Sequence, residues 1–146
     1  RKHTPALEAA RTSRRLYRMW IPAEFAKPPK TFFKTHGGIY RIRNTQNDFV
    51  YVGQTGQFKE RYESHLYTLR SGRGVNPLLQ GDWNSYGESA FVFELVYCFP
   101  SNMIGTHRAV TYKWLSDLEA EEYSRYEGRH YNVYKPRRPR VGWQAR

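Results

Sequence analysis

The sequence has 146 residues, of which 39% are hydrophobic and 24 are aromatic (4 Trp, 12 Tyr and 8 Phe), enough to close the core of one ordinary domain. Its apolar runs fall well short of the roughly 20 residues that a membrane helix needs, and a signal-peptide core is absent, so we expect a soluble intracellular protein in a cytoplasmic, nucleoid or viral setting, with no membrane partner. The formal net charge of +11, from 24 basic against 13 acidic residues, favours a polyanionic partner.

The N-terminal region is expected to be a basic arm. Pro5 near its start and the pattern that follows predict a helix over residues 5–20. Four arginines give this helix a basic side: Arg11, Arg14, Arg15 and Arg18. Residues 21–30 contain three prolines, which is typical of a linker. The first residue is Arg1 and not methionine, which is typical of a fragment of a larger chain.

The excess positive charge lies in the two flanks. Residues 1–30 carry eight Lys/Arg and two Asp/Glu, residues 135–146 carry five and none, and residues 31–134 balance at eleven against eleven. Basic flanks can capture nucleic-acid phosphates by releasing counterions, although charge alone equally permits arms that only solubilise the chain. We predict an arm and linker over 1–34, a core over 35–134 and a basic tail over 135–146.

A β-hairpin is predicted at the start of the core. Residues 38–44 and 49–53 are rich in β-branched and aromatic side chains, and they flank the polar turn 45–48. Tyr40 and Tyr51 lie on its two strands.

A helix is expected to follow the hairpin, opening at Thr55-Gly56. Its apolar members recur at i, i+4, i+8 and i+11, and they are Phe58, Tyr62, Leu66 and Leu69. Arg61 and His65 share a neighbouring stripe one helical turn apart, so their side chains should project in similar directions.

A second helix is predicted after the glycine-rich loop 71–74. Asn76 suits the N-cap, Pro77 the first helical position and Gly87 the terminator. Its apolar face would consist of Leu79, Trp83 and Tyr86.

The alternation of side chains along residues 90–97, with a large apolar residue at every second position, predicts a third strand. One side of this strand would carry Phe91, Phe93, Leu95 and Tyr97. Cys98 is the only cysteine and therefore cannot form an internal disulfide, and no Cys/His spacing in the sequence resembles a zinc site. We therefore interpret Cys98 as a buried structural thiol. Residues 98–107 are expected to be an irregular connection.

The last helix is predicted from about residue 108 to residue 126, and residues 131–133 would end the core. Its inward side chains would be Val110, Trp114, Leu115 and Leu118. The predicted fold class is α/β (α+β), a small three-stranded mixed or antiparallel sheet flanked by helices.

Ordered motifs now give a specific resemblance. Gly38-Ile39-Tyr40 is followed after eleven residues by Tyr51-Val52-Gly53, then by Arg61 ten residues later and His65 one turn on. This pattern resembles the GIY-YIG nuclease family, with Val in place of Ile in the second motif, a swap of β-branched residues. The likeness, closest to the homing-endonuclease branch, covers about residues 37–133 and continues through Asn76, Leu79-Gln80, Trp83, Tyr86-Gly87 and Tyr131-Asn132.

The resemblance implies roles for individual residues. In the family the first tyrosine handles the nucleophilic water and the helix arginine contacts the scissile phosphate, roles that would fall to Tyr40 and Arg61. A nearby guanidinium or a metal would favour the phenolate. Tyr51 would line the same site, and His65 would bridge Tyr51 to phosphate or water. Supporting positions would be Gly53 and Asn132, although a capping or turn role suits Asn132 equally well.

A metal ligand is implied on the last helix, where the family places one glutamate. Glu119 is our first choice because its helical neighbours at −4, −1, +4 and +7 are apolar, and because its separation from Asn132 fits the family best. Glu122 is second and Glu121 third. One carboxylate with several waters suits Mg²⁺ or Mn²⁺.

The stretch from residue 99 to residue 108 lengthens the path to the last helix, either as a substrate-contacting loop or as an insertion without function. The resemblance implies metal-dependent hydrolysis of DNA phosphodiesters, leaving 5′-phosphate and 3′-hydroxyl ends, by nicking or double-strand cleavage. RNA stays open as a substrate, and homing, restriction, repair and phage-defence roles remain alternatives.

The flanks would bind nucleic-acid phosphates without contacting the bases, and so without recognising a particular base sequence. We expect the protein to be a monomer or a homodimer. The expected phosphate contacts are Arg11, Arg14, Arg15, Lys135, Arg137, Arg138 and Arg140. The alternative function is an inactive GIY-YIG-fold module that binds nucleic acid or recruits a partner. The intact set of Tyr40, Tyr51, Arg61 and His65 favours the enzyme.

Overall fold

The structure is a computed structural model, and it describes residues 30–105 and 108–132. The predicted helix over 5–20, most of the linker and the basic tail lie outside these residues. So do the seven predicted phosphate contacts of the flanks.

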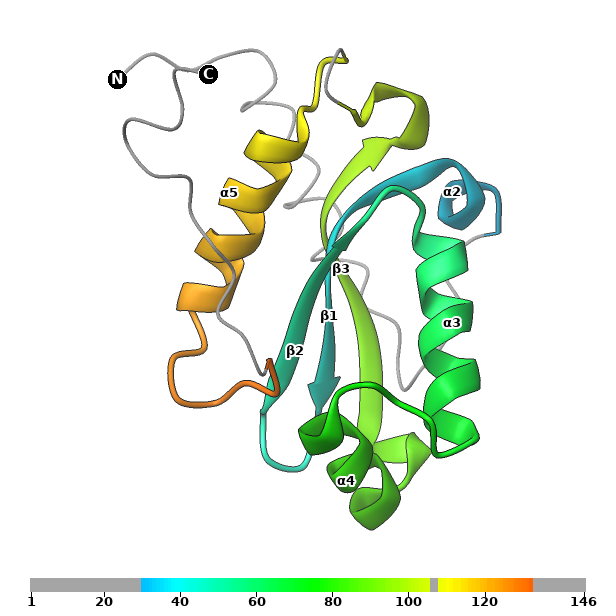
Figure 1. Cartoon of the computed structure of the whole chain (residues 1–146), viewed down its shortest axis with the longest axis vertical. Helices are drawn as coiled ribbons and strands as arrows, with labels where there is room; N and C mark the ends of the chain where they lie inside the picture. Colours follow the sequence, from blue (N-terminus) through cyan, green and yellow to red (C-terminus); the bar gives the residue numbers. More distant parts are fainter. Residues whose placement is uncertain (1–29, 106–107, 133–146) are drawn as a thin grey trace.

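The predicted hairpin is confirmed, with both strands longer than expected. β1 spans His36–Asn44 and β2 spans Val50–Thr55, and they pair antiparallel with Tyr40 opposite Gly53 and Ile42 opposite Tyr51. β3, Phe91–Pro100, pairs antiparallel with β1, so the sheet order is β2-β1-β3 and β2 is an edge strand (Figure 1). The predicted fold class is therefore confirmed, with all three strands antiparallel.

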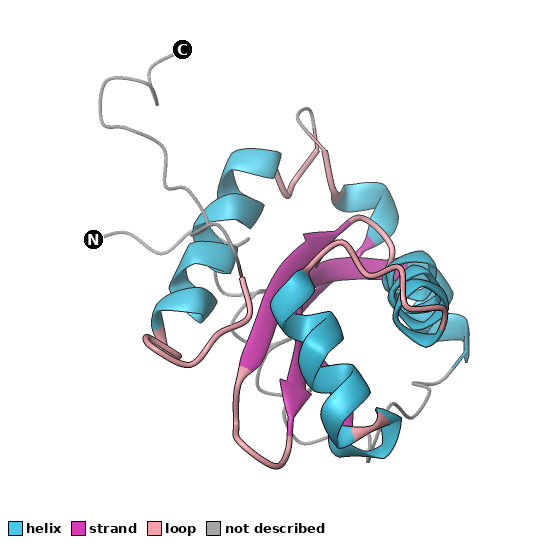
Figure 2. Ribbon diagram, turned by 60° about the horizontal axis from the view of Figure 1, so that its bottom comes forward, coloured by secondary structure: helices cyan, strands magenta, loops and turns pink. Residues whose placement is uncertain are grey.

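Helices cover both faces of the sheet (Figures 1 and 2). α3, Phe58–Arg70, lies on one side together with the short α2, Lys30–Thr35, while α5, Tyr112–Ser124, lies on the other. α4, Pro77–Tyr86, and two 3₁₀ turns, Glu88–Ala90 and Ser101–Met103, complete the fold. The two helical layers give the sheet a separate apolar core on each face.

The core facing α3 contains Tyr40, Phe58, Tyr62, Leu66, Leu69, Leu79, Trp83, Phe91 and Phe93 among others. The core facing α5 contains Ile39, Val50, Val52, Val96, Tyr97, Phe99, Leu115 and Leu118 among others. The four predicted apolar residues of α3 are all buried, as are two of the three predicted for α4. Tyr86, the third, is 45% exposed, so that part of the prediction is wrong.

The third strand differs from its prediction because it contains a β-bulge. Ile39 pairs with Tyr97 whereas Tyr40 pairs with Leu95, so Val96 is an extra residue in β3. The extra residue turns Tyr97 onto the face opposite Leu95, although a strict alternation had put both on one side. β3 also runs to Pro100, so residues 98–100 are strand and not irregular connection.

The last helix begins later than predicted. Thr111 caps it, with its hydroxyl accepting from the Trp114 backbone N–H at 3.1 Å, and α5 therefore starts at Tyr112. Val110 is buried as expected, but it reaches the core through a bridge to Ile104 that precedes the helix.

The chain's described end closes the outer edge of β2. The backbone N–H of Val50 donates to the Arg129 carbonyl at 3.1 Å, and that of Tyr131 donates to the Val50 carbonyl at 2.7 Å. The Asn132 side chain then bonds both backbone groups of Val52. The edge strand is thus covered beside the two tyrosine motifs. None of the helices in the described part of the chain has the length and apolar character to cross a membrane.

Candidate active site

Tyr40 and His65 form the centre of the candidate site. Tyr40 projects from β1 toward α3, is 2% exposed, and its ring stacks on Phe93 with centroids 5.0 Å apart. Its hydroxyl lies 2.8 Å from Nε2 of His65, which comes from the middle of α3. A phenol and an imidazole are therefore joined in a hydrogen bond across the sheet–helix interface.

Tyr51 lies beside this pair. Its ring centroid is 6.5 Å from that of Tyr40 and 5.5 Å from that of His65, and the planes of the Tyr51 and His65 rings form an angle of 69°. The hydrogen bond that the structure shows for His65 goes to Tyr40, whereas the sequence had suggested a link to Tyr51. Tyr51 is half-buried, so its phenol can reach a ligand that approaches the site.

Gly53 makes room for the Tyr40 side chain. The two residues face each other on neighbouring strands, and a Cβ built on Gly53 would lie 2.6 Å from Cζ of Tyr40 and even closer to its hydroxyl. A side chain at position 53 would therefore displace the phenol. This contact gives a physical reason for the glycine of the second motif.

Arg61 lies one turn before His65 on α3 and is exposed. Its positive charge lowers the pKa of Tyr40, Tyr51 and His65 alike. A guanidinium that acts on all three groups and remains open to solvent is suited to bind an incoming phosphate.

Glu119 approaches from the other side of the sheet. It belongs to α5, and its Oε1 accepts a 2.7 Å hydrogen bond from Nε2 of Gln54 on the edge strand β2. Its negative charge raises the pKa of Tyr40 and of Tyr51, although these side chains project toward α3. The structure thus brings Tyr40, Tyr51 and His65 into contact, with Arg61 one turn from His65 on the same helix and Glu119 across β2, where its charge still acts on both tyrosines.

Burial dominates the protonation of the site. Desolvation raises the pKa of Tyr40 well above 10, more than Arg61 lowers it, so in the protein alone Tyr40 is a neutral phenol. The sequence-based expectation that a nearby guanidinium favours the phenolate is not met by Arg61 acting alone. Burial, assisted by Arg61, lowers the pKa of His65 to about 4, so its imidazole is neutral at pH 7.

The other two glutamates of α5 have different surroundings. Glu122 is fully buried, and its Oε2 accepts from Nη1 of Arg41 at 2.8 Å. Glu121 is exposed and lies 3.5 Å from Nη2 of Arg125. Within the described ranges no Lys or Arg forms a salt bridge with Glu119. The geometry therefore favours Glu119 over Glu122 and Glu121 as a cation ligand, and the assignment stays a prediction.

Two residues beside the site were not singled out in the sequence. Gln54 directly follows the second motif, and Arg41 directly follows the first, but nothing in their spacing reveals that α5 supplies their partners. Asn132, predicted as a supporting residue, accepts from Val52 N–H at 3.0 Å and donates to the Val52 carbonyl at 2.8 Å. It therefore holds the strand segment between Tyr51 and Gly53.

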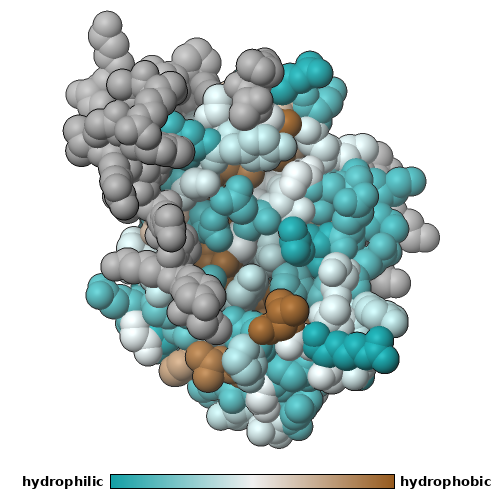
Figure 3. Space-filling view, in the orientation of Figure 1, coloured by the Kyte–Doolittle hydropathy of each residue, from teal (hydrophilic) through white to brown (hydrophobic). Residues whose placement is uncertain are grey.

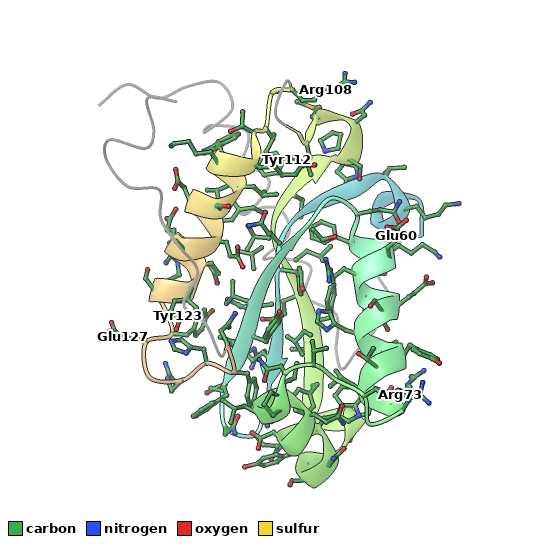
Figure 4. All side chains as sticks on the ribbon, in the orientation of Figure 1. Glu60, Arg73, Arg108, Tyr112, Tyr123 and Glu127 are labelled. Atoms are coloured by element: carbon green, nitrogen blue, oxygen red, sulfur yellow. The ribbon has the colours of Figure 1, made fainter. Side chains whose placement is uncertain are left out.

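Side chains fill the space between α3, the sheet and α5 (Figure 4). In the same orientation the visible surface over this region is mainly hydrophilic, with small apolar patches (Figure 3). A charged, hydrated ligand is compatible with such a face.

Comparisons with known proteins identify similar sequences and a similar fold. Residues 36–102 match the family model of the GIY-YIG catalytic domain. The chain is 30% identical over 100 residues to "Probable intron-encoded endonuclease 1" of Neurospora crassa, a match that covers 68% of this chain and 30% of that protein. It is 40% identical over 57 residues to "Intron-associated endonuclease 1" of Enterobacteria phage T4, covering 39% and 22%. The chain therefore spans less than a third of the length of these curated relatives.

Two solved structures share the fold. A mutant form of the catalytic domain of intron endonuclease I-TevI superimposes with a TM-score of 0.57 at 23% identity, covering 70% of this chain and 98% of that one. A second structure of the catalytic domain of homing endonuclease I-TevI gives a TM-score of 0.50 at 26% identity, covering 67% and 98%. Both matches span almost all of the solved domain.

Proposed function

We propose that this chain, whose residues 36–102 belong to the GIY-YIG catalytic-domain family, is an endonuclease that hydrolyses phosphodiester bonds of DNA with the help of a divalent cation. The observation that carries the proposal is the contact of Tyr40 and Tyr51 with His65, beside Arg61 and Glu119, whose charges act on both tyrosines. These groups offer a proton acceptor, a phosphate ligand and a cation ligand, which together meet the needs of phosphodiester hydrolysis.

Tyr40 and His65 would activate the attacking water. Because its imidazole is neutral at pH 7, His65 can accept the phenol proton at Nε2 while the Tyr40 oxygen takes a proton from water. The water oxygen then bonds to phosphorus and the bond to the 3′ oxygen breaks. The proton held on His65 passes to solvent or to the leaving oxygen, so the products are a 5′-phosphate and a 3′-hydroxyl.

Arg61 and Tyr51 would orient the scissile phosphate. The exposed guanidinium can donate two N–H groups to phosphoryl oxygens, which places charge where it develops in the transition state. The half-buried Tyr51 phenol, next to His65, can donate to the same group or to the attacking water.

A divalent cation would be held by the Glu119 carboxylate. The carboxylate fits this role because one oxygen is bonded to an uncharged amide and no described cationic side chain pairs with it. Mg²⁺ or Mn²⁺ suits such sparse ligation, since both keep several waters and substrate oxygens. When bound, the ion would stabilise negative charge on the phosphoryl and leaving oxygens.

The relatives support DNA as the substrate and an intron-associated, homing-type role among the contexts considered. Because the chain covers only a part of both relatives, target specificity would depend on segments outside the 36–102 domain as well.

The test is incubation of supercoiled plasmid with the protein and Mg²⁺, Mn²⁺ or a chelator. We expect nicked or linear product with either ion and none with the chelator. Tyr40→Phe, Arg61→Ala and Glu119→Gln should each slow cleavage by about 10²- to 10⁴-fold. Tyr67→Phe serves as the matched control, because Tyr67 lies on α3 but is 65% exposed.

Retention of the plasmid without nicking in either metal would favour the binding-only module and overturn the proposal. Cut sites mapped on a long random duplex would then distinguish a fixed target motif from a structural preference or indiscriminate cleavage.

A further inference from the structure

Alternate residues of β2 form hydrogen bonds with other parts of the chain along the outer edge of the sheet. Val50, Val52 and Gln54 alternate along the strand, and their side chains face α5. The backbone of Val50 is bonded by Arg129 and Tyr131, and that of Val52 by the Asn132 side chain. The Gln54 side chain bonds to α5 and not to the segment of residues 129–132.

The side-chain amide of Gln54 donates hydrogen bonds to two residues that lie one turn apart on α5. Its Nε2 lies 2.7 Å from Oε1 of Glu119 and 3.2 Å from Oγ of Ser116, so each of its two N–H groups has an acceptor. Ser116 and Glu119 are three residues apart and therefore lie one above the other on the helix. Gln54 is thus the link between the edge strand of the tyrosine motifs and the glutamate.

We propose that Gln54 is a positioning residue that sets the side-chain conformation of Glu119, so that one carboxylate oxygen is held by the protein and the other stays available to a divalent cation. This inference rests on the proposed function, because it assigns a purpose to the same site. It extends that function by naming the residue that prepares the cation ligand.

The physical reason is pre-organisation. A free glutamate samples several rotamers, and ordering its side chain on cation binding would cost conformational entropy. The hydrogen bond from Gln54 restricts Glu119 before the cation arrives, and an uncharged donor does so without neutralising the carboxylate. Outer partners of metal ligands typically change metal affinity or activity by about 10- to 100-fold when they are removed.

The test compares the full chain with Gln54→Met, which keeps the length of the side chain but has no N–H donor. Mn²⁺ binding is measured without DNA, from the paramagnetic broadening of backbone amide signals near residues 54 and 119. We expect Mn²⁺ affinity to fall by about 10- to 100-fold. The metal concentration for half-maximal plasmid cleavage should rise by a similar factor, whereas the KM for DNA stays unchanged.

Gln46→Met is the matched control, since it makes the same chemical change in the exposed hairpin turn and should bind Mn²⁺ like the unmodified protein. Gln54→Ser, too short to reach α5, is the second variant in case Gln54→Met does not fold, and it should show the same loss. Unchanged Mn²⁺ affinity in a folded Gln54 variant would overturn the positioning role alone. Absence of Mn²⁺ binding to the unmodified protein, or its survival in Glu119→Gln, would instead overturn the metal site of the proposed function.

Discussion

Gly53 shows how much the candidate site depends on a single missing side chain. A Cβ at this position would lie 2.6 Å from Cζ of Tyr40, whose ring is buried and stacked on Phe93. We predict that Gly53→Ala forces Tyr40 away from His65 and lowers the cleavage rate by 100-fold or more, on the order of the loss of a general base. Plasmid nicking under saturating Mg²⁺ measures the rate.

The same substitution should cost about 1 to 3 kcal/mol of unfolding free energy, because it overpacks a core contact. Gly81→Ala is the control: Gly81 lies in α4 with open space around its Cβ, and alanine there should stabilise the helix by about 0.5 to 1 kcal/mol. Unimpaired cleavage by Gly53→Ala would show that the Tyr40 contact with His65 is dispensable.

His65 predicts a pH dependence of stability. Burial lowers its pKa to about 4 in the folded protein, whereas the ordinary value in an unfolded chain is 6.5. Between these values the unfolded state binds more protons, so the contribution of His65 is complete above pH 6.5 and is lost as the pH falls to about 4. The difference corresponds to a loss on the order of 3 kcal/mol.

Urea denaturation between pH 4 and pH 7 checks this prediction, together with an NMR titration of the imidazole. His65→Gln, which can still accept a hydrogen bond from Tyr40, should remove most of the acid-induced loss, and His130→Gln should leave that loss in place because His65 remains. An imidazole that titrates near 6.5 in the folded protein would contradict the burial that the structure shows.

For the individual side chains of the site, the sequence predicted which residues belong to it but not their protonation states. Tyr40, Tyr51, Arg61 and His65 follow from motif spacing, because a hairpin and the next helix are local structures. The neutral states of Tyr40 and His65 depend on Phe93 and other distant residues that bury them, and spacing carries no information about that burial.

The interface between α5 and the sheet contains a buried ion cluster. Arg41 on β1 forms short ion pairs with Glu94 on β3 and with Glu122 on α5, and it also bonds the hydroxyl of Tyr126. Glu94 and Glu122 are 1% and 0% exposed. The cluster fixes the same side of α5 that carries Glu119 one turn earlier.

Replacing the cation of this cluster should therefore be costly. Arg41→Met removes the cation that Glu94 and Glu122 share, leaving Arg43 beside Glu94 and Arg125 3.5 Å from Glu122. We predict a loss of about 3 to 5 kcal/mol in unfolding free energy at pH 7. Arg70→Met is the comparison, because the Arg70–Glu88 pair is exposed and its loss should cost no more than about 1 kcal/mol. Equal effects of the two substitutions in urea denaturation would show that burial does not strengthen the cluster.

The elements themselves could be predicted from the sequence where the signals are local. The hairpin, α3 and α4 follow from turn residues, helical periodicity and the Asn76 cap. The bulge at Val96 and the buried pairing of Glu122 could not be predicted, because both arise from contacts between strands and helices far apart in the chain.

For the whole molecule, charge is divided between a neutral core and basic flanks. Residues 31–134 carry eleven basic and eleven acidic residues, so the net charge of +11 belongs to residues 1–30 and 135–146. Many exposed cations of the core are already paired with carboxylates, as Lys59 is with Glu63. Long-range attraction of DNA should therefore come from the flanks.

We predict that replacing the four basic residues Lys135, Arg137, Arg138 and Arg140 by Gln weakens DNA binding equally for all sequences. If each contacts one phosphate, the slope of log K against log salt concentration should become less steep by about 3 to 4. Fluorescence anisotropy with a labelled duplex at several salt concentrations measures this slope.

The matched control replaces four basic residues that pair with carboxylates in the structure, Lys59, Arg70, Lys113 and Arg125. Their positive charge is offset locally, so the same number of substitutions should change the slope less. An equal change would mean that DNA contacts the core directly and that the tail contributes no more than any other basic surface. A smaller change in the control, with unaltered core stability in both variants, would assign counterion release to the tail, which like residues 1–30 carries an excess of basic over acidic residues.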